Sequence, residues 1–166
     1  MKIYLTFALA EIGAVGTYFA LTIFVTNIIW FIGPKHFPSE RIYILATLYA
    51  GVPSAFLCGF VGGLLVRSRP VVFGTVFVLV AQLLMILGTS SLMTRFHFWM
   101  AALLSVAAAS GGAYFGMSIM SRLGKREPLH PVWTGLVALA LIVVTWTATV
   151  FETRAMAFSI LKAIAQ

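Results

Sequence analysis

Charged residues in this chain gather in a few short clusters, and the stretches between these clusters are long and apolar. A hydrocarbon core of about 30 Å needs about 20 helical residues to cross it, at about 1.5 Å per residue. Five stretches reach this length, at residues 3–33, 42–66, 71–93, 98–120 and 132–151. The pattern predicts an all-α, polytopic integral membrane protein with a bundle of about five transmembrane helices.

The composition is far from that of a soluble domain. Of the 166 residues, 61% are hydrophobic and 9% are charged, with a mean hydropathy of +1.05, whereas soluble domains carry about 25% charged residues. Membrane lipids are therefore expected to contact much of the surface. The net charge of +7 comes from basic residues that flank the apolar stretches, so we expect no nucleic-acid partner.

We expect residues 1–151 to form a single transmembrane helical domain and residues 152–166 to form an amphipathic C-terminal tail. Apolar tail residues fall on one side of a helical wheel, namely Phe158, Ile160, Leu161 and Ile164. Such a helix suits the membrane surface or a partner protein, although the tail could equally continue the last span into solvent. The apolar run between Lys2 and Ala8 is shorter than the core of about 7–15 residues in a signal peptide, so we expect the first helix to be retained.

Five crossings would divide the basic residues between the two sides of the membrane. One side would hold Lys2, Arg67, Arg69, Arg122, Lys125 and Arg126, and the other would hold Lys35, Arg41, Arg95, Arg154 and Lys162. Setting aside the two tail residues favours the first side further, and the positive-inside rule then predicts a cytoplasmic N-terminus. The compact size and short connections point to a bacterial inner (plasma) membrane.

Glu11 is an ionisable residue within the first apolar stretch. Such a group is costly to bury in a membrane and by default marks an ion, proton or substrate path. If the helix begins at Ile3, Glu11 lies roughly 12 Å along it, near the bilayer middle. The stretch is longer than a span needs, so a crossing by residues 12–33 would instead leave Glu11 at the interface. Both placements stay open.

Two amides are further transport candidates. Asn27 is the only asparagine of the chain, and Gln82 lies in the middle of the third stretch. Either side chain can form a hydrogen bond across helices that contributes about 1 kcal/mol or less. A structural contact is the favoured interpretation of both, ahead of a contact with substrate.

Small residues mark the second and fourth stretches as packing helices. In the second, Pro53 removes a backbone hydrogen bond and predicts a kink, while Gly59 and Gly63 form a GxxxG face. The fourth stretch carries small residues at spacings of four, namely Ser105, Ala109 and Ala113, and Gly112 and Gly116. We predict that these two helices pack together at the centre of the bundle, or alternatively that they line a substrate path.

Residues for familiar catalytic chemistry are scarce. The chain has four glutamates, no aspartate and one cysteine, Cys58, so we expect neither paired-carboxylate chemistry nor a carboxylate-rich metal site. His36, His97 and His130 all lie in connections, so we expect no intramembrane metal or haem pair. No phosphate-binding loop, zinc-protease motif or serine triad stands out. We therefore expect no enzyme activity, metal or cofactor.

Two functions remain compatible with the sequence. The first is a small transporter or channel component that moves a small solute or ion with Glu11 as its coupling carboxylate. The second is a non-catalytic structural or assembly subunit of a larger membrane complex, in which the small-residue faces and the tail are docking surfaces. Five spans make a thin bundle, so we expect a homo-oligomer or other membrane subunits as partners.

Overall fold

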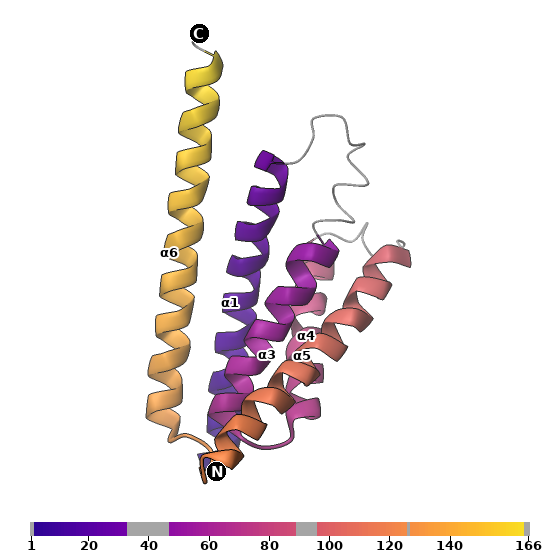
Figure 1. Cartoon of the computed structure of the whole chain (residues 1–166), viewed down its shortest axis with the longest axis vertical. Coiled ribbons are helices and arrows are strands. Elements are labelled where there is room, and N and C mark those ends of the chain that lie inside the picture. The colour runs from indigo at the N-terminus through magenta and orange to yellow at the C-terminus, as the bar shows by residue number, and fades with distance from the viewer. Residues whose placement is uncertain (1, 33–46, 89–95, 126, 165–166) are drawn as a thin grey trace.

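A computed structural model describes residues 2–32, 47–88, 96–125 and 127–164, and these residues form helices and connections with no strand. The elements in chain order are α1 (Lys2–Ile32), the π-helical turn η1 (Thr47–Gly51), α3 (Val52–Val66), α4 (Pro70–Gly88), α5 (Phe96–Arg122) and α6 (Pro131–Ile164) (Figure 1). The predicted all-α class is confirmed for this part of the chain.

Four helices are long and apolar enough to cross a membrane. Their apolar segments are Lys2–Ile29, Pro70–Leu87, Trp99–Arg122 and Pro131–Ala157, which agrees with the predicted membrane location. The helix α3 has only 15 residues, although η1 precedes it directly. The predicted start of this span, residue 42, lies outside the described residues, so a fifth crossing stays a prediction.

The last helix extends past residue 151, where the last span was predicted to end. Helix α6 continues without interruption from Pro131 to Ile164, because no glycine or proline after Gly135 breaks it. Its 34 residues correspond to about 51 Å, which exceeds the hydrocarbon core. The predicted tail is thus the end of α6, as in the alternative of a continuing last span. The span ends predicted at residues 33 and 93 lie outside the described residues.

The helices fall into two sets by direction. Figure 1 shows α1, α4 and α6 running one way and α3 and α5 running the opposite way, with the chain termini at opposite ends. The most extensive packing joins α3 to α5, and the next joins α1 to α6. Each of these two pairs is therefore parallel and is formed by helices that are not consecutive in the sequence.

The contact between α3 and α5 depends on glycine. A Cβ atom added at Gly59 would overlap the carbonyl oxygen of Ala109, and one added at Gly63 would overlap that of Ala113. From the other helix, a Cβ atom at Gly112 or Gly116 would overlap the carbonyl oxygen of Phe56 or Phe60, respectively. The two backbones thus approach closely at four glycines in register, as small-xxx-small faces allow.

Pro53 lies where the helix geometry changes. It occupies the first turn of α3, immediately after the π-helical turn η1. Proline has no backbone N–H and cannot complete the preceding turn, and π-helical turns accompany such breaks in the hydrogen-bond ladder. The change from π-helical to α-helical geometry therefore lies next to Pro53, the residue for which a kink was predicted.

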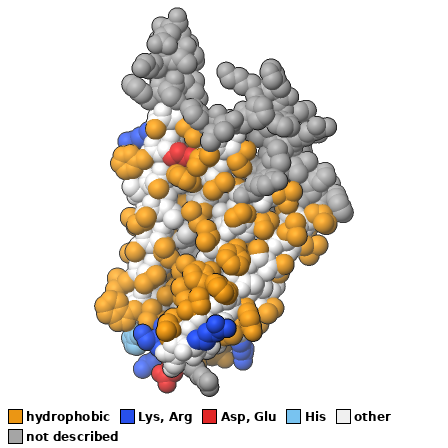
Figure 2. Space-filling model, in the orientation of Figure 1, with side chains coloured by type: hydrophobic (Ala, Val, Ile, Leu, Met, Phe, Trp, Pro, Cys, Tyr) orange, Lys and Arg blue, Asp and Glu red, His pale blue; other side chains and the backbone are white. Residues whose placement is uncertain are grey.

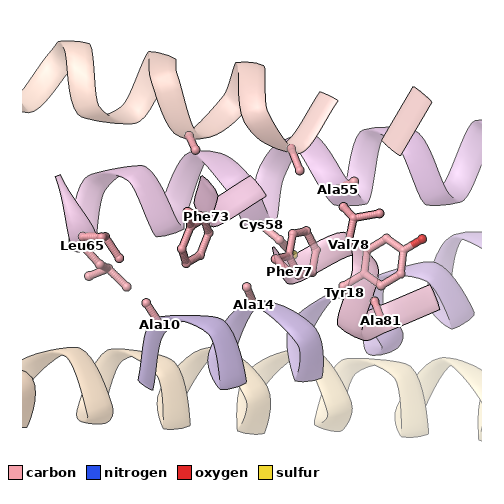
Figure 3. Close-up of a cluster of buried hydrophobic side chains, with 13 residues drawn as sticks. Ala10, Ala14, Tyr18, Ala55, Cys58, Leu65, Phe73, Phe77, Val78 and Ala81 are labelled. Carbon is pink, nitrogen blue, oxygen red and sulfur yellow. The ribbon is translucent and has the colours of Figure 1, made fainter. Parts of the chain in front are cut away.

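Large side chains of α4 fill the centre of the bundle. Phe73 and Phe77 are almost completely buried, and they make edge-to-face contacts with Phe7 and Tyr18 of α1. Figure 3 shows both α4 rings between α1 and α3. A Cβ atom at Gly62 of α3 would overlap the Phe73 ring, so a glycine in α3 makes room for this aromatic contact.

Basic side chains gather at the end of the bundle that holds the N-terminus (Figure 2). The basic residues at this end are Lys2, Arg67, Arg69, Arg122 and Lys125. The connections are tied together here, because Arg67 Nη1 donates to the Glu127 carbonyl oxygen at 2.7 Å and the Leu129 N–H donates to the Leu65 carbonyl oxygen at 2.9 Å. The Thr6 hydroxyl donates to the Leu129 carbonyl oxygen at 3.0 Å and attaches α1 to the same junction.

Candidate functional site

Glu11 carries two buried oxygens without a hydrogen-bond partner. Neither Oε1 nor Oε2 has a donor within reach in the described part of the chain. The residue lies nine positions after Lys2 in α1, or about 14 Å along the helix axis. Polar groups buried in proteins are nearly always hydrogen-bonded, so a buried carboxyl group without a protein partner is a candidate functional group.

The surroundings of Glu11 are aromatic and aliphatic. Positions 7, 11 and 18 share one face of α1, because residues four and eleven apart fall on the same side of a helix. Phe7 contacts Phe73 and Tyr18 contacts Phe77, with ring centroids 5.6 Å and 5.5 Å apart. Glu11 therefore lies on the side of α1 that meets α4, between two aromatic contacts.

Asn27 joins α1 to α6. Its Nδ2 donates to Thr153 Oγ1 at 3.2 Å and to Glu152 Oε2 at 3.5 Å. These bonds hold the ends of two parallel helices together, which is the structural contact favoured for this amide. The other oxygen of Glu152, Oε1, is buried and has no hydrogen-bond partner among the described residues.

Gln82 is buried in α4, with 7% of its surface exposed. Its carbonyl oxygen Oε1 has no hydrogen-bond partner within the described residues, and the same holds for the hydroxyls of Thr17 and Ser110. Unpaired oxygens thus occur on α1, α4 and α5. No described contact joins Glu11, Asn27 and Gln82 directly, so the three transport candidates do not form one compact site.

Ser105 links the packing helices to Tyr18. Its side chain in α5 is 1% exposed, and its hydroxyl interacts with the Tyr18 phenol. The phenol oxygen also lies 3.2 Å from where a Cβ atom of Gly51 would be. Tyr18 thus reaches from α1 to η1 and α5, and this junction was not evident from the sequence.

An elongated apolar cavity of about 140 Å³ lies between α1, α3 and α6. Small residues of α1 line one wall, including Ala10, Gly13 and Ala14, and Cys58 and Val61 of α3 line another. Figure 3 shows Ala10 and Ala14 pointing from α1 toward α3. Glu11 does not line this cavity, because it lies on a different side of α1.

Two features of the site were not predicted. Glu152 follows the predicted end of the last span and was assigned to the tail, so its pairing with Asn27 was missed. Thr149 is buried, and its hydroxyl lies 2.9 Å from the Thr145 carbonyl oxygen of its own helix and 3.1 Å from the Ala20 carbonyl oxygen of α1; the first contact is usual for threonine in a helix, and the second joins two helices. Glu152 and Thr149 lie within one helical turn of each other, and this pair of polar residues was the sequence signal for a polar contact near the end of the last span.

No described group of residues resembles a metal site. Within residues 2–32, 47–88, 96–125 and 127–164, no three His, Cys, Asp or Glu side chains lie close enough together to hold an ion. Cys58 is a free, buried thiol. His36 and the side chain of His97 lie outside the described residues, and His130 is exposed at the start of α6.

No protein-family model matches the chain, and neither a curated protein nor a solved structure gives a significant match. The function therefore has to be argued from the arrangement of the chain's own residues.

Proposed function

We propose that this protein is a small proton-coupled carrier or channel component in which Glu11 is the coupling carboxylate. The observation that carries the proposal is that both Glu11 oxygens are buried without a hydrogen-bond partner among the described residues. An intramembrane carboxylate is expensive to maintain, and carboxylates of this kind mark ion or proton paths.

A proton fits Glu11 better than a divalent cation does. Ca²⁺ takes about six to eight oxygen ligands and Mg²⁺ needs an octahedral set, but the described residues contain no group of three His, Cys, Asp or Glu side chains that could hold such an ion. A proton needs only one acceptor oxygen. The unpaired carbonyl oxygen of Gln82 on α4 is a polar group that a chain of water molecules could connect to Glu11 in a transport state.

The packing of α3 and α5 also supports transport over an assembly role. Gly59, Gly63, Gly112 and Gly116 approach the backbone of the other helix within the same chain. These faces are therefore occupied internally, which leaves the C-terminal end of α6 as the docking surface that the alternative function would use.

One observation favours the alternative of a non-catalytic subunit. Apolar residues spaced along one side of α6 are more than half exposed, namely Val132, Leu136, Leu139 and Val143. Lipid or another membrane protein could cover this side. Native mass spectrometry after gentle extraction separates the cases, because a homo-oligomer supports a self-sufficient carrier and stoichiometric foreign subunits support the assembly role.

The carrier proposal can be tested by infrared spectroscopy, because the chain has few acidic residues. With four glutamates and no aspartate, acid–base infrared difference spectra of the protein in vesicles contain few carboxyl signals. We expect Glu11→Gln to remove one reversible signal and to abolish proton-driven solute uptake into vesicles, because glutamine keeps the shape but cannot exchange a proton.

Glu152→Gln is the matched control for this experiment. It makes the same chemical change in a half-buried side chain of α6 that accepts a hydrogen bond from Asn27, and we expect it to preserve uptake. Normal uptake by Glu11→Gln with an unchanged infrared spectrum would contradict the proposal. Equal unfolding temperatures of the two variants would rule out a loss through misfolding.

A further inference from the structure

The cavity between α1, α3 and α6 has almost no polar surface in its walls. Its volume of about 140 Å³ is close to that of an engineered apolar cavity of about 150 Å³ that stays dry and binds benzene or xenon. Water needs two to four polar partners to occupy a cavity. An apolar occupant is therefore favoured over water or a polar solute.

The lining of the cavity runs along the helix axes. It extends along α1 from Ala10 to Leu21, a distance of about 17 Å on a helix. The volume of about 140 Å³ holds only a few carbon atoms, as a benzene-sized cavity does. A short hydrocarbon segment lying parallel to the helices would contact side chains of all three helices.

The cavity also has access to the lipid side of the bundle. Helices α3 and α6 form two of its walls but pack little against each other, so no tight helix contact closes the space between them. Leu57 of α3 lines the cavity and is 51% exposed. At the basic end, by contrast, the bond between Leu129 and Leu65 ties the α5–α6 connection to α3.

We propose that this cavity binds one acyl chain of a membrane lipid, entering from the side between α3 and α6. Three observations together favour this occupant: apolar walls, a volume that holds a short hydrocarbon segment, and a mouth toward the lipid-facing surface. Acyl chains are the apolar groups that surround such a mouth in a bilayer. The bound chain fills the gap left by the sparse α3–α6 contact and stabilises the position of α6, and this role does not depend on proton transfer by Glu11.

The test places the protein in phosphatidylcholine vesicles. A small share of this lipid carries a photoreactive diazirine in the middle of one acyl chain and serves as the probe. After irradiation, adducts are mapped by mass spectrometry. We expect adducts on Val61 and Leu141, which line the cavity, in addition to adducts on the outward-facing Leu103, which is 66% exposed.

A cavity-filling variant makes the assignment specific. Ala14 lines the cavity and is 7% exposed, so Ala14→Phe should cause loss of the Leu141 adduct and leave the Leu103 adduct unchanged. Ala140→Phe places the same side chain on the exposed side of α6 and should change neither. If Ala14→Phe does not fold, Val61→Phe fills the cavity from α3 and gives the same readout at Leu141.

Two results would overturn the proposal. The first is a Leu141 adduct of unchanged yield in both filling variants, which would place the lipid outside the cavity. The second is labelling of the cavity by free phenyldiazirine but not by the lipid probe, which would make the occupant a small apolar molecule.

Discussion

At the scale of single residues, the α3–α5 contact leaves no space for a side chain at Gly59. A Cβ atom there would overlap the Ala109 carbonyl oxygen, and neither backbone can yield without separating the helices. We expect Gly59→Ala to lower the free energy of unfolding by about 1–3 kcal/mol, as overpacking does in protein cores. The measurement is denaturant unfolding of the protein in detergent micelles.

Gly111 provides the matched control on α5. It is exposed and has no atom within 4 Å of the position that a Cβ atom would take. Gly111→Ala should leave stability unchanged or raise it by up to about 1 kcal/mol, because alanine favours the helix more than glycine does. Similar losses for both variants would show that helix propensity, rather than the close approach, governs these positions.

Single residues also show the limits of sequence interpretation. Gly59, Gly63, Gly112 and Gly116 were selected because small residues four apart allow helices to approach, and the structure places them against each other's helices. The Asn27 partner was not predictable, because an amide on a helix indicates that a bond is needed without specifying which helix provides the acceptor.

At the scale of elements, α6 depends on α1 for its position, since α1 is the helix against which it packs extensively. A Cβ atom at Gly13 would lie 2.6 Å from the Ala138 Cβ, whereas one at Gly135 would lie at an ordinary 3.6 Å from Leu9 Cδ1. Gly13→Ala should therefore displace α6, and Gly135→Ala should be accommodated.

Spin labels on the exposed residues Leu5 and Trp133 measure this displacement in a Cys58→Ser background. We expect a longer or broader distance distribution for Gly13→Ala only, with an unfolding free energy lower by about 1–3 kcal/mol. An unchanged distribution would mean that α6 is held mainly by its hydrogen bonds from Thr149 and Asn27.

At the scale of the whole molecule, the two ends of the bundle differ in charge and in the chain terminus that they hold. The arrangement predicts that the end with Arg67 and Lys125 is cytoplasmic and that the end of α6 is on the opposite side. Single cysteines at Glu127 and Ala155, again with Cys58→Ser, test this with a membrane-impermeant maleimide. Labelling of Ala155→Cys alone in intact cells is expected. Labelling of both would contradict a crossing by α6, and labelling of Glu127→Cys alone would contradict the predicted orientation.

The helical class and the membrane location follow from the sequence alone, because both depend on local properties. Bilayer thickness sets the length of an apolar helix, and backbone groups in lipid must be satisfied within the helix. Within the described residues, stretches 3–33, 71–93 and 98–120 therefore lie close to α1, α4 and α5, and stretch 132–151 lies inside α6. Helix α6 continues past residue 151, because the sequence becomes more polar there but keeps residues that favour a helix.

Only the tertiary structure decided which helices are partners and which polar groups stay unpaired. The pairing of α1 with α6 and of α3 with α5 brings together residues far apart in the chain, and an apolar helix carries little information about its partner because lipid and protein are similarly apolar surroundings. The sequence shows that Glu11 lies in the first apolar stretch. Whether its oxygens have partners, and whether a cavity forms on another side of α1, depends on how the helices pack.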